Sequence, residues 1–439
     1  MPSMMNEKKW SRTMLERLLR WCAVLVLKKY HPIIVGVTGS VGKSSTKEAI
    51  ALVLAAQYII RKSEGNYNNE IGIPLTILGE RSPGHSIVGW TRVVMRSLAL
   101  FLLPYRYPEV LVLEMAVDRP GDMRYLLSFI PVDVGVITRI GESHLEHFKT
   151  VGAIAREKGL LVTHLAESGF AILNADDGRV ISLREKVKAK VMTYSLSGEA
   201  TVSGAHYGFD ERTGVGCSFK MQYAGTSIPV RLPHIVGEHL IASVLAAAAV
   251  GVALKINPVS IVEALESFES LPGRMSLIAG RHGTLLLDDS YNASPDSVRA
   301  ALMTLSKMRV SRKVLVLGDM LDLGPSTDMF HTALTDQICS MGLSGVFLLG
   351  EKARLLRKTL VASGFSQDRI FVFDHPDAVG ASLAEFLREG DAVLIKGSRG
   401  MRMEKVVECA MEHPEDASKL LCCQSSEWRA KPFDQISNI

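Results

Sequence analysis

The sequence predicts an α/β protein with two successive parallel β-sheets. Apolar runs typical of buried strands alternate with helical runs from residue 31 to about 180, and the same alternation returns after residue 274. Between these two parts, residues 190–235 change to short alternating runs, which predict a small antiparallel insert. A length of 439 residues allows two or three domains, each with a large core.

Composition excludes several classes of protein. Apolar residues make up 47% of the chain and charged residues 22%, which is ordinary for a soluble globular protein. The net charge of +4 is nearly neutral at this length, so charge does not indicate nucleic acid. None of the six cysteines falls in a CxxC pair, so neither a zinc site nor a disulfide framework is expected. A cytoplasmic protein is predicted.

Residues 1–30 are expected to form an amphipathic helix ahead of the first sheet. Trp10, Leu15, Leu18 and Cys22 lie at helical spacing, with arginines between them, and residues 90–103 repeat this basic amphipathic pattern. The apolar run in the first segment is too short to span a bilayer. Such helices either pack on the protein or lie on a membrane surface. Packing is the preferred interpretation, and peripheral membrane contact is the alternative.

The first sheet is predicted from four buried runs. They are Ile33–Val37, Val110–Leu113, Val134–Ile137 and Phe170–Leu173. The insert contributes the runs at 191–194 and 216–223, and a long alanine-rich helix follows from Leu240 to about Ala253.

The second alternating part begins after a predicted hinge at residues 271–274. Its strands are predicted at Leu285–Leu287, Val314–Leu317, Val346–Leu349, Ile370–Phe373 and Ala392–Ile395. This spacing is typical of a doubly wound, Rossmann-like sheet. We therefore expect an N-terminal helix at 1–30, a central domain at 31–273, a C-terminal domain at 274–424 and a flexible tail at 425–439.

A glycine-rich run, Gly-Val-Thr-Gly-Ser-Val-Gly-Lys-Ser-Ser-Thr at 36–46, separates the first predicted strand from the next helix. Strand, loop and helix together make a phosphate cradle: backbone N–H groups face an anion, Lys43 supplies charge and the Ser44 hydroxyl can bind Mg²⁺. Val37 stands where the strict P-loop pattern needs glycine. A chance Gly-Lys-Ser is the alternative, but the flanking strand and helix favour a P-loop-type ATPase domain. The predicted phosphate-binding residues are Gly39, Ser40, Gly42, Lys43, Ser44 and Ser45.

Other residues with useful chemistry also follow predicted strands. Glu114 ends the run 110–113, where a carboxylate typically reaches a nucleotide-bound Mg²⁺. His144 comes after the run 134–137, and Lys158 lies in a later helical stretch. A polar loop occupies 65–74, and Asp-Asp-Ser-Tyr-Asn at 288–292 and Lys-Gly-Ser-Arg at 396–399 follow strands of the second part.

Together these segments resemble the Mur ligases, the ATP-dependent amide-forming enzymes of peptidoglycan precursor synthesis. The matching segments lie in the family's order within residues 31–410, at 36–45, 65–74, 288–295, 317–324 and 396–399. The Asp-Asp-Ser-Tyr-Asn segment favours the branch that adds D-alanyl-D-alanine to a UDP-muramoyl tripeptide.

The resemblance implies a role for each matching residue. Lys43 and the loop amides hold the β- and γ-phosphates of ATP, and Ser44, Glu114 and His144 bind Mg²⁺. Lys158 matches the lysine that the family carbamylates, which gives it a carboxylate-like metal ligand. The implied catalytic set is therefore Lys43, Glu114, His144 and Lys158. Contacts to ATP from both sides of a cleft are implied for Asn68, Asn69, His239, Arg274, Asp289 and Asn292.

The implied chemistry is carboxylate activation. ATP phosphorylates a carboxylate to an acyl phosphate, an amine attacks, and phosphate leaves; positive charge neutralises the phosphoryl group during transfer. Lys396 and Arg399 would recognise the acceptor's carboxylate. Each residue also has an ordinary alternative: a strand-end carboxylate, a surface histidine, a solvated lysine or a hinge salt bridge.

Two features depart from the family pattern. Only 35 residues precede Gly36, so the family's N-terminal UDP-binding domain is not expected here. Leu240 and Ser243 stand where the family has asparagines that help hold the nucleotide, although His239 is kept.

The sequence leaves the substrate open. The first hypothesis is a ligase that adds an amino acid or dipeptide to a muramoyl-peptide-like acceptor. The alternatives are another cell-envelope or poly-amino-acid acceptor, or an ATP-binding scaffold at the membrane. A monomer acting on small-molecule and peptide substrates, without nucleic acid, is expected.

Overall fold

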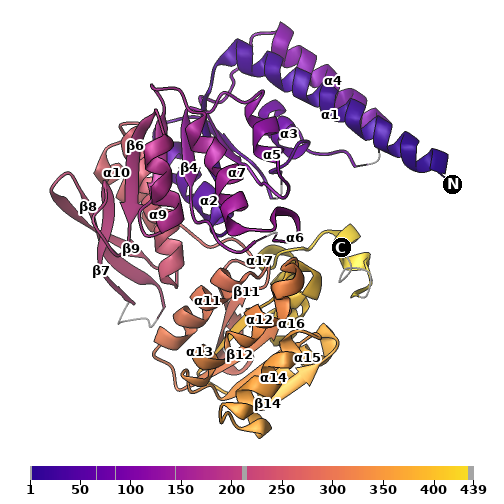
Figure 1. The fold of residues 1–439 in the computed structure, drawn as a ribbon, viewed down its shortest axis with the longest axis vertical. Helices are drawn as coiled ribbons and strands as arrows, with labels where there is room; N and C mark the ends of the chain where they lie inside the picture. The colour runs from indigo at the N-terminus through magenta and orange to yellow at the C-terminus, as the bar shows by residue number, and fades with distance from the viewer. Residues whose placement is uncertain (1, 66, 85, 144, 210–214, 434–439) are drawn as a thin grey trace.

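The structure of the chain is a computed structural model that describes residues 2–65, 67–84, 86–143, 145–209 and 215–433. It contains two β-sheets, each covered by helices, and a pair of helices that projects from the first of them (Figure 1). In Figure 1 the first sheet lies in the upper part of the molecule and the second in the lower part, with α6 and α17 between them. The predicted α/β class is confirmed.

Within the described residues, the first sheet has nine strands in the order β2-β3-β1-β4-β5-β6-β7-β8-β9. The strands are β1 (Ile33–Thr38), β2 (Ile60–Lys62), β3 (Val110–Glu114), β4 (Val134–Ile137), β5 (Phe170–Asn174), β6 (Lys190–Ser195), β7 (Val202–Phe209), β8 (Cys217–Tyr223) and β9 (Thr226–Leu232). From β2 to β6 in this order, all neighbouring strands pair in parallel. All four predicted buried runs are strands of this sheet.

The predicted antiparallel insert needs a correction at its start. Strand β6 pairs in parallel with β5, and β7 pairs in parallel with β6, so the parallel sheet continues into the region assigned to the insert. Among the described strands of the first sheet, antiparallel pairing is confined to β7, β8 and β9. The alternating pattern gave the strands correctly, but it carries no information about direction. The short edge strand β2 was not predicted.

Helices cover both faces of the first sheet. They are α1 (Pro2–Tyr30), α2 (Lys43–Ala55), α3 (Gly72–Leu78), α4 (Ile87–Leu102), α5 (Asp122–Leu127), α6 (Leu145–Phe148), α7 (Val151–Thr163), α8 (Gly178–Ile181), α9 (Glu238–Ala253) and α10 (Pro258–Glu266). Along β1 and β3 successive side chains enter opposite cores: Val35 packs with the α2 and α9 side, and Ile34 with the α1 and α3 side. The sheet is therefore buried on both faces, as its continuous apolar runs predict.

The second sheet has the order β10-β11-β15-β12-β13-β14. Its strands are β10 (Ser276–Gly280), β11 (Thr284–Asp289), β12 (Arg312–Gly318), β13 (Gly345–Leu349), β14 (Ile370–Phe373) and β15 (Asp391–Lys396). Strand β10 is an antiparallel edge that was not predicted; the other neighbours pair in parallel. The covering helices are α11 (Pro295–Lys307), α12 (Thr327–Thr332), α13 (Thr335–Cys339), α14 (Ala353–Ala362), α15 (Pro376–Phe386) and α16 (Met403–Ala410), and α17 (Ala417–Leu420) and α18 (Ser426–Ala430) follow.

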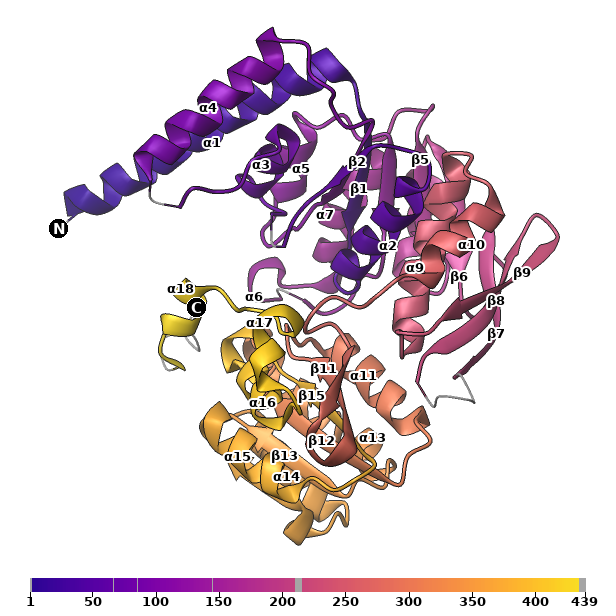
Figure 2. The same ribbon diagram turned by 180° about the vertical axis from the view of Figure 1, so that it is seen from behind.

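The N-terminal helix α1 packs on the protein along one face. Leu19, Cys22, Ala23 and Val26 of this face are buried in the core that also contains residues of α3 and α7. Helix α4 runs beside α1 in both ribbon views (Figures 1 and 2). Among the described residues no helix has both the length and the apolarity needed to cross a bilayer.

The chain passes between the two sheets at the predicted hinge, and Asp288 supports this turn. The Asp288 carboxylate is buried, and it accepts hydrogen bonds from the backbone N–H groups of Gly273 (3.0 Å) and Ser290 (3.1 Å). Gly273 has φ +71°, and a Cβ there would meet the Cys422 sulfur at 2.8 Å. The hinge is thus fixed by glycine geometry and by one buried carboxylate.

The pH dependence of stability tests the hinge carboxylate. Burial raises the pKa of Asp288 from 3.8 to about 6. Between these values the folded state keeps a proton that the unfolded chain releases, so the free energy of unfolding falls as pH rises, by about 3 kcal/mol from this group. Asp288→Asn removes the titrating group. We therefore expect the difference in unfolding free energy between wild type and variant to change by about this amount across the window.

Chemical denaturation at several pH values between 3.8 and about 6 measures this difference. The matched control is Asp368→Asn, at an exposed position of the second sheet's surface, which should follow the wild type. Parallel pH curves for wild type and Asp288→Asn would contradict the assignment.

Candidate active site

The loop between β1 and α2 has the backbone that a phosphate cradle needs. Gly42 precedes α2 with φ 86°, a conformation that suits glycine, and Ser44 and Ser45 occupy the first buried turn of the helix. Ser40 N–H donates to the Arg139 carbonyl at 2.6 Å, so the loop is bonded to the end of β4. The first N–H groups of a helix lack partners within it, and here they face the loop.

Gly39 allows the loop to approach β4 closely. It has φ +152°, and a Cβ at this position would lie 1.9 Å from the Thr138 hydroxyl oxygen. That hydroxyl also donates to the Val41 carbonyl at 2.6 Å, which holds the far side of the loop. Thr138 was not identified from the sequence, because a threonine at a strand end has no distinctive pattern.

Lys43 and Lys158 lie within electrostatic reach of each other under this loop. Lys43 Nζ donates to the Gly39 carbonyl at 2.9 Å, and burial lowers its pKa, with Glu114 acting in the opposite direction. Lys158, on α7, is 1% exposed. Burial, and secondly the charge of Lys43, lower the pKa of Lys158 to about 7. Near neutral pH this amine is therefore unprotonated in about half of the molecules.

Glu114 ends β3 beside these lysines. Its side chain is buried; Asn68 donates to Oε1 at 3.2 Å, and Lys47 Nζ lies 3.8 Å from Oε2. Oε2 has no hydrogen-bond partner among the described residues. Lys47 was missed in the sequence, although it follows Lys43 by one helical turn and therefore lies on the same side of α2.

The predicted contacts of Asn69 and His144 are not seen among the described residues. The Asn69 side chain accepts hydrogen bonds from the N–H groups of Ile71 and Gly72 at the start of α3, so its carboxamide oxygen has a local role. His144 lies outside the described residues. Their predicted contacts to nucleotide and metal stay predictions.

A second group of predicted residues gathers at the ends of β11 and β15. Lys396 is buried, and its Nζ donates to Asp289 Oδ2 at 2.6 Å and to the Asn292 carbonyl at 3.0 Å. We call the part of the chain around the first sheet the first half and the part around the second sheet the second half. His239, at the start of α9 in the first half, lies within electrostatic reach of this pair. Burial lowers the pKa of His239, and the charge of Asp289 acts in the opposite direction. The charge of Lys396 is thus already paired within the protein. Of the two residues predicted to recognise the substrate carboxylate, Arg399 has a donor, Nε, with no hydrogen-bond partner among the described residues.

Arginines from both sides of the hinge stack on Tyr291. The Arg274 guanidinium carbon lies 4.2 Å from the centre of the Tyr291 ring, and that of Arg399 lies 5.8 Å from it. Arg399 also lies 4.5 Å from the Trp428 ring of α18. Arg274 is close enough to Lys43 to help lower its pKa. Arg274 therefore brings a positive charge of the hinge within electrostatic reach of the phosphate loop.

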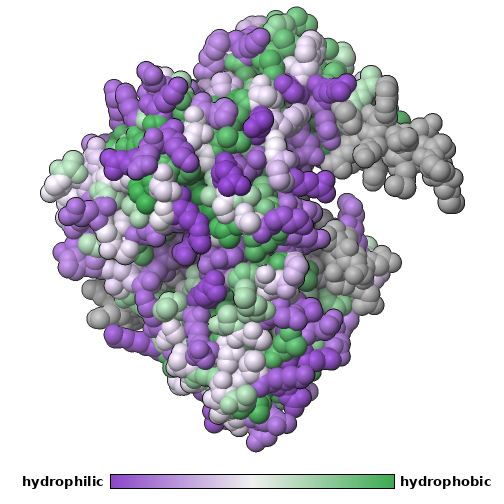
Figure 3. All heavy atoms as spheres, viewed as in Figure 1, coloured by the Kyte–Doolittle hydropathy of each residue, from purple (hydrophilic) through white to green (hydrophobic). Residues whose placement is uncertain are grey.

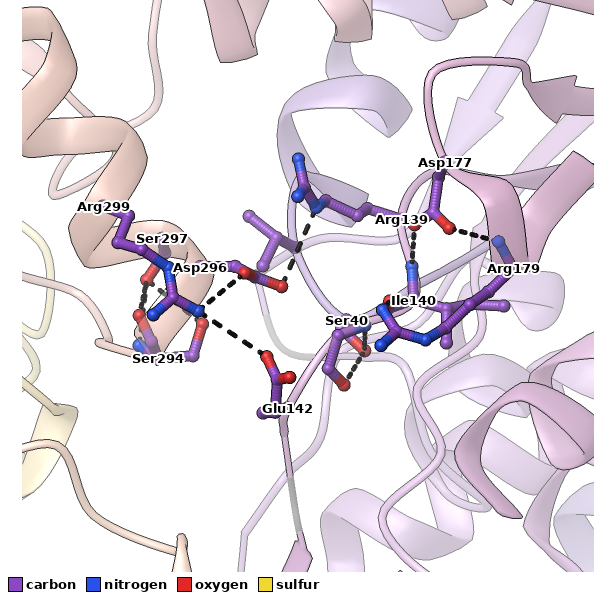
Figure 4. Close-up of polar contacts among 12 residues, drawn as sticks. Ser40, Arg139, Ile140, Glu142, Asp177, Arg179, Ser294, Asp296, Ser297 and Arg299 are labelled. Carbon is purple, nitrogen blue, oxygen red and sulfur yellow. Dashed lines mark hydrogen bonds and ion pairs between the residues drawn. The ribbon is translucent and has the colours of Figure 1, made fainter. Parts of the chain in front are cut away.

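Ion pairs join the two halves next to the loop (Figure 4). Arg139, after β4, lies 3.8 Å from Asp296, and Arg299 lies 3.1 Å from Asp296 and 3.8 Å from Glu142. Asp296 and Arg299 belong to α11, while Arg139 and Glu142 belong to the segment that bonds Ser40. A Cβ at Gly141 would lie 2.0 Å from Asp296 Oδ2, so the two halves are in close contact here.

The site suits a metal ion only with an added ligand. No group of three or more His, Cys, Asp or Glu side chains that could hold a metal occurs among the described residues. The ligand atoms present are Glu114 Oε2, which accepts no hydrogen bond from the described residues, and the Ser44 hydroxyl; both are hard ligands of the kind Mg²⁺ prefers. A divalent ion fits this set when nucleotide phosphates or a modified Lys158 complete it.

Comparisons with known proteins agree with this geometry. A family model described as "Mur ligase middle domain" matches residues 37–88 and 94–251. A second, described as "Mur ligase, glutamate ligase domain", matches residues 273–399. The two matches cover the first and second sheets, respectively.

Curated relatives and solved structures share most of the chain. UDP-N-acetylmuramoyl-tripeptide–D-alanyl-D-alanine ligase of Bacillus subtilis is 30% identical over 401 residues, which is 90% of this chain and 79% of that protein. The enzyme of the same name from Escherichia coli is 30% identical over 87% of this chain and 77% of its own length. The crystal structure of MurF ligase from Thermotoga maritima in complex with ADP superposes with a TM-score of 0.73 at 27% identity, covering 93% and 84% of the two chains.

Gly39→Ala tests the close approach of the loop. The added Cβ cannot lie 1.9 Å from the Thr138 oxygen, so the loop must move and the N–H groups lose their alignment. We expect affinity for adenine nucleotides to fall at least tenfold, about 1.4 kcal/mol, without loss of the fold. Calorimetric titration with ADP measures this.

The matched control is Gly178→Ala, where a Cβ meets nothing within 4 Å and φ is not positive. It should bind as the wild type does. Unchanged binding by Gly39→Ala would show that the loop is not the phosphate site.

Proposed function

The chain belongs to the Mur ligase family, and we propose that it is an ATP-dependent ligase that joins D-alanyl-D-alanine to a UDP-muramoyl-tripeptide-like acceptor. Relatives named for this reaction are 30% identical over most of the chain. We also propose that it works as a monomer in the cytoplasm on small-molecule and peptide substrates. ATP and Mg²⁺ would be its cofactors.

One observation carries the proposal: Lys43, Glu114 and Lys158 converge beneath the loop at 39–42. Glu114 acts on the pKa of both lysines, Lys43 helps to lower the pKa of Lys158, and Asn68 donates a hydrogen bond to Glu114, so these contacts support the grouping. A generic ATP-binding fold needs the loop alone. A buried lysine with a pKa near 7 beside a buried carboxylate instead suits an enzyme that handles a phosphoryl group and a metal together.

The residues of the chain would divide the work as follows. Lys43 and the loop N–H groups hold the phosphates and neutralise charge during transfer to the acceptor carboxylate. Glu114, Ser44 and Lys158, with His144, would hold Mg²⁺, which would help to neutralise the charge of the phosphates. Asn68 would orient Glu114, and Arg274 would reach the nucleotide from the hinge. Asn69, His239, Asp289 and Asn292 complete the proposed nucleotide contacts.

The second half would bind the carboxylate of the acceptor. Arg399, with its unpaired Nε, is the proposed anchor for a substrate carboxylate, and Lys396 would act through Asp289. The ion pairs of Asp296 with Arg139 and of Arg299 with Glu142 join the two halves, which would keep water from an activated carboxylate.

The ligation reaction tests the proposal. Incubation with ATP, UDP-muramoyl tripeptide and D-alanyl-D-alanine should yield the ligated product, detected by mass, with ADP formed in equal amount. Lys43→Ala should lower turnover at least a hundredfold, because it removes the charge that faces the phosphates, and should leave the thermal unfolding temperature close to that of the wild type. Lys358→Ala, an exposed lysine of α14, is the control and should be fully active.

Two results would contradict the proposal. ADP release that needs an amine but yields no product with this acceptor would assign the enzyme to another carboxylate. A fully active Lys43→Ala variant would remove the lysine from the phosphate site.

Carbamylation of Lys158 has its own test. Carbon dioxide reacts only with the unprotonated amine, and burial lowers the pKa of Lys158 to about 7, so carbamate should increase as pH rises through neutrality and decrease below it. With ¹³C-bicarbonate, NMR should show one carbamate resonance that Lys158→Arg lacks. Lys158→Ala should be inactive and should regain part of its activity with added acetate, whose carboxylate replaces the carbamate.

A wild-type spectrum without this resonance at alkaline pH would refute carbamylation. Acetate that also activated the Lys43→Ala variant would show that the rescue is not specific to position 158.

A further inference from the structure

The outer sides of α1 and α4 carry apolar side chains that contact no core. Of the sixteen large apolar side chains that are exposed among the described residues, ten lie in α1, in α4 or just after α4. The most exposed include Val88 (81%), Leu102 (72%), Met14 (69%), Met95 (62%) and Trp21 (53%). Scattered single exposures are normal, but a concentration of this kind marks an interaction site.

Six of these ten side chains lie in two stripes, one along each helix. In α1, Met14, Leu18, Trp21, Leu25 and Lys28 follow helical spacing on the side opposite to the buried Leu19, Cys22 and Val26. In α4 the stripe is Val88, Arg92, Met95, Ala99 and Leu102, opposite to the buried Val93 and Ser97. We call these two stripes together the α1/α4 surface.

The two stripes begin and end at similar positions along the paired helices. Lys29 Nζ donates to the Leu100 carbonyl at 2.8 Å, and the Tyr30 hydroxyl donates to the same oxygen at 2.8 Å, so the C-terminal ends of α1 and α4 are together and the helices run in the same direction. Figures 1 and 2 show the pair extending beyond the rest of the molecule. Figure 3 shows hydrophobic atoms gathered at the end of the pair that lies uppermost in that view.

Positive charge is concentrated on the same two helices. Together α1 and α4 contain nine basic and two acidic residues, a net charge of +7. The whole chain has a net charge of +4, so the remainder is net −3. Arg17, Lys28 and Arg92 are exposed within or beside the stripes. The chain therefore separates its charge, with the positive part on the projecting helices.

We propose that the α1/α4 surface binds an anionic lipid membrane, with the helices lying in the interface. A polar face rich in Lys and Arg, apolar side chains including Trp, and the absence from the described residues of a helix able to span a bilayer are the features of interfacial helices. Negatively charged lipid complements the +7 charge, and lipid tails cover Leu18, Met95 and Leu102. This proposal does not depend on the ligase activity.

The same features argue against a second copy of the chain or nucleic acid as the partner of this surface. A second copy would bring two +7 surfaces together, and that repulsion opposes a symmetric dimer. Nucleic acid would complement the charge but would leave the aliphatic side chains exposed to water. A membrane surface satisfies both the charge and the apolar side chains.

Vesicle sedimentation of the full chain tests the proposal. We expect the wild type to sediment with vesicles of phosphatidylcholine and phosphatidylglycerol, at least tenfold more weakly with phosphatidylcholine alone, and more weakly when salt is raised from about 0.1 M to about 1 M. The double variant Leu18→Glu/Met95→Glu should lose at least tenfold in affinity, and Arg17→Glu/Arg92→Glu should lose the preference for anionic lipid. Both variants should keep the turnover of ATP in solution.

The matched control is Met329→Glu/Val361→Glu, which changes two exposed apolar residues of the second half and should bind as the wild type does. Three results would overturn the proposal: no sedimentation of the wild type with anionic vesicles, equal binding by wild type and Leu18→Glu/Met95→Glu, or a wild-type dimer in gel filtration that this variant converts to a monomer. The last result would assign the surface to a second copy.

Discussion

The burial of lysine ammonium groups next to one carboxylate is the constraint on which the site depends. A buried ammonium must be paired, lose its proton or meet an anion. Lys47 is paired, through the Ser63 carbonyl at 2.7 Å and ion pairs with Glu48 and Glu114. Lys158 loses its proton more easily than a free lysine, because its pKa is lowered to about 7. Lys43 points back to its own loop, and it is the ammonium group left to neutralise an incoming anion.

The topology of the first sheet explains why these groups meet. Strand β1 lies between β3 and β4, so the phosphate loop, Glu114 and Thr138 all lie at the carboxyl ends of neighbouring strands. In open parallel sheets ligands bind where the chain changes direction across the sheet, and here that change falls at β1. Helix α7 then adds Lys158 from the face of the sheet. The loop would bind the phosphates, and Glu114 and Lys158 beside it would hold the metal ion.

Local patterns predicted the central strands of both sheets, but they missed the edge strands β2 and β10 and the geometry that depends on distant partners. The apolar runs predicted β1, β3, β4 and β5 because a strand buried on both faces is continuously apolar. They could not give the direction of β6, since direction depends on the connection that precedes it. Lys47 and Thr138 were missed, and the pairing of Lys396 with Asp289 was not predicted, because burial and pairing are set by the tertiary fold.

The junction between the two halves and the α1/α4 surface lie in different parts of the molecule, so membrane attachment and the ligase reaction can occur together. The second half meets the first through Asp296, Arg139 and the hinge, at the carboxyl edge of the first sheet. Helix α1 instead packs on the face of that sheet through Leu19 and Val26, and α4 lies outside it. In Figure 1 the two regions lie at opposite ends of the first half. A membrane bound to the α1/α4 surface would therefore leave the junction free, so the ion pairs beside the phosphate loop could open and close while the protein stays attached.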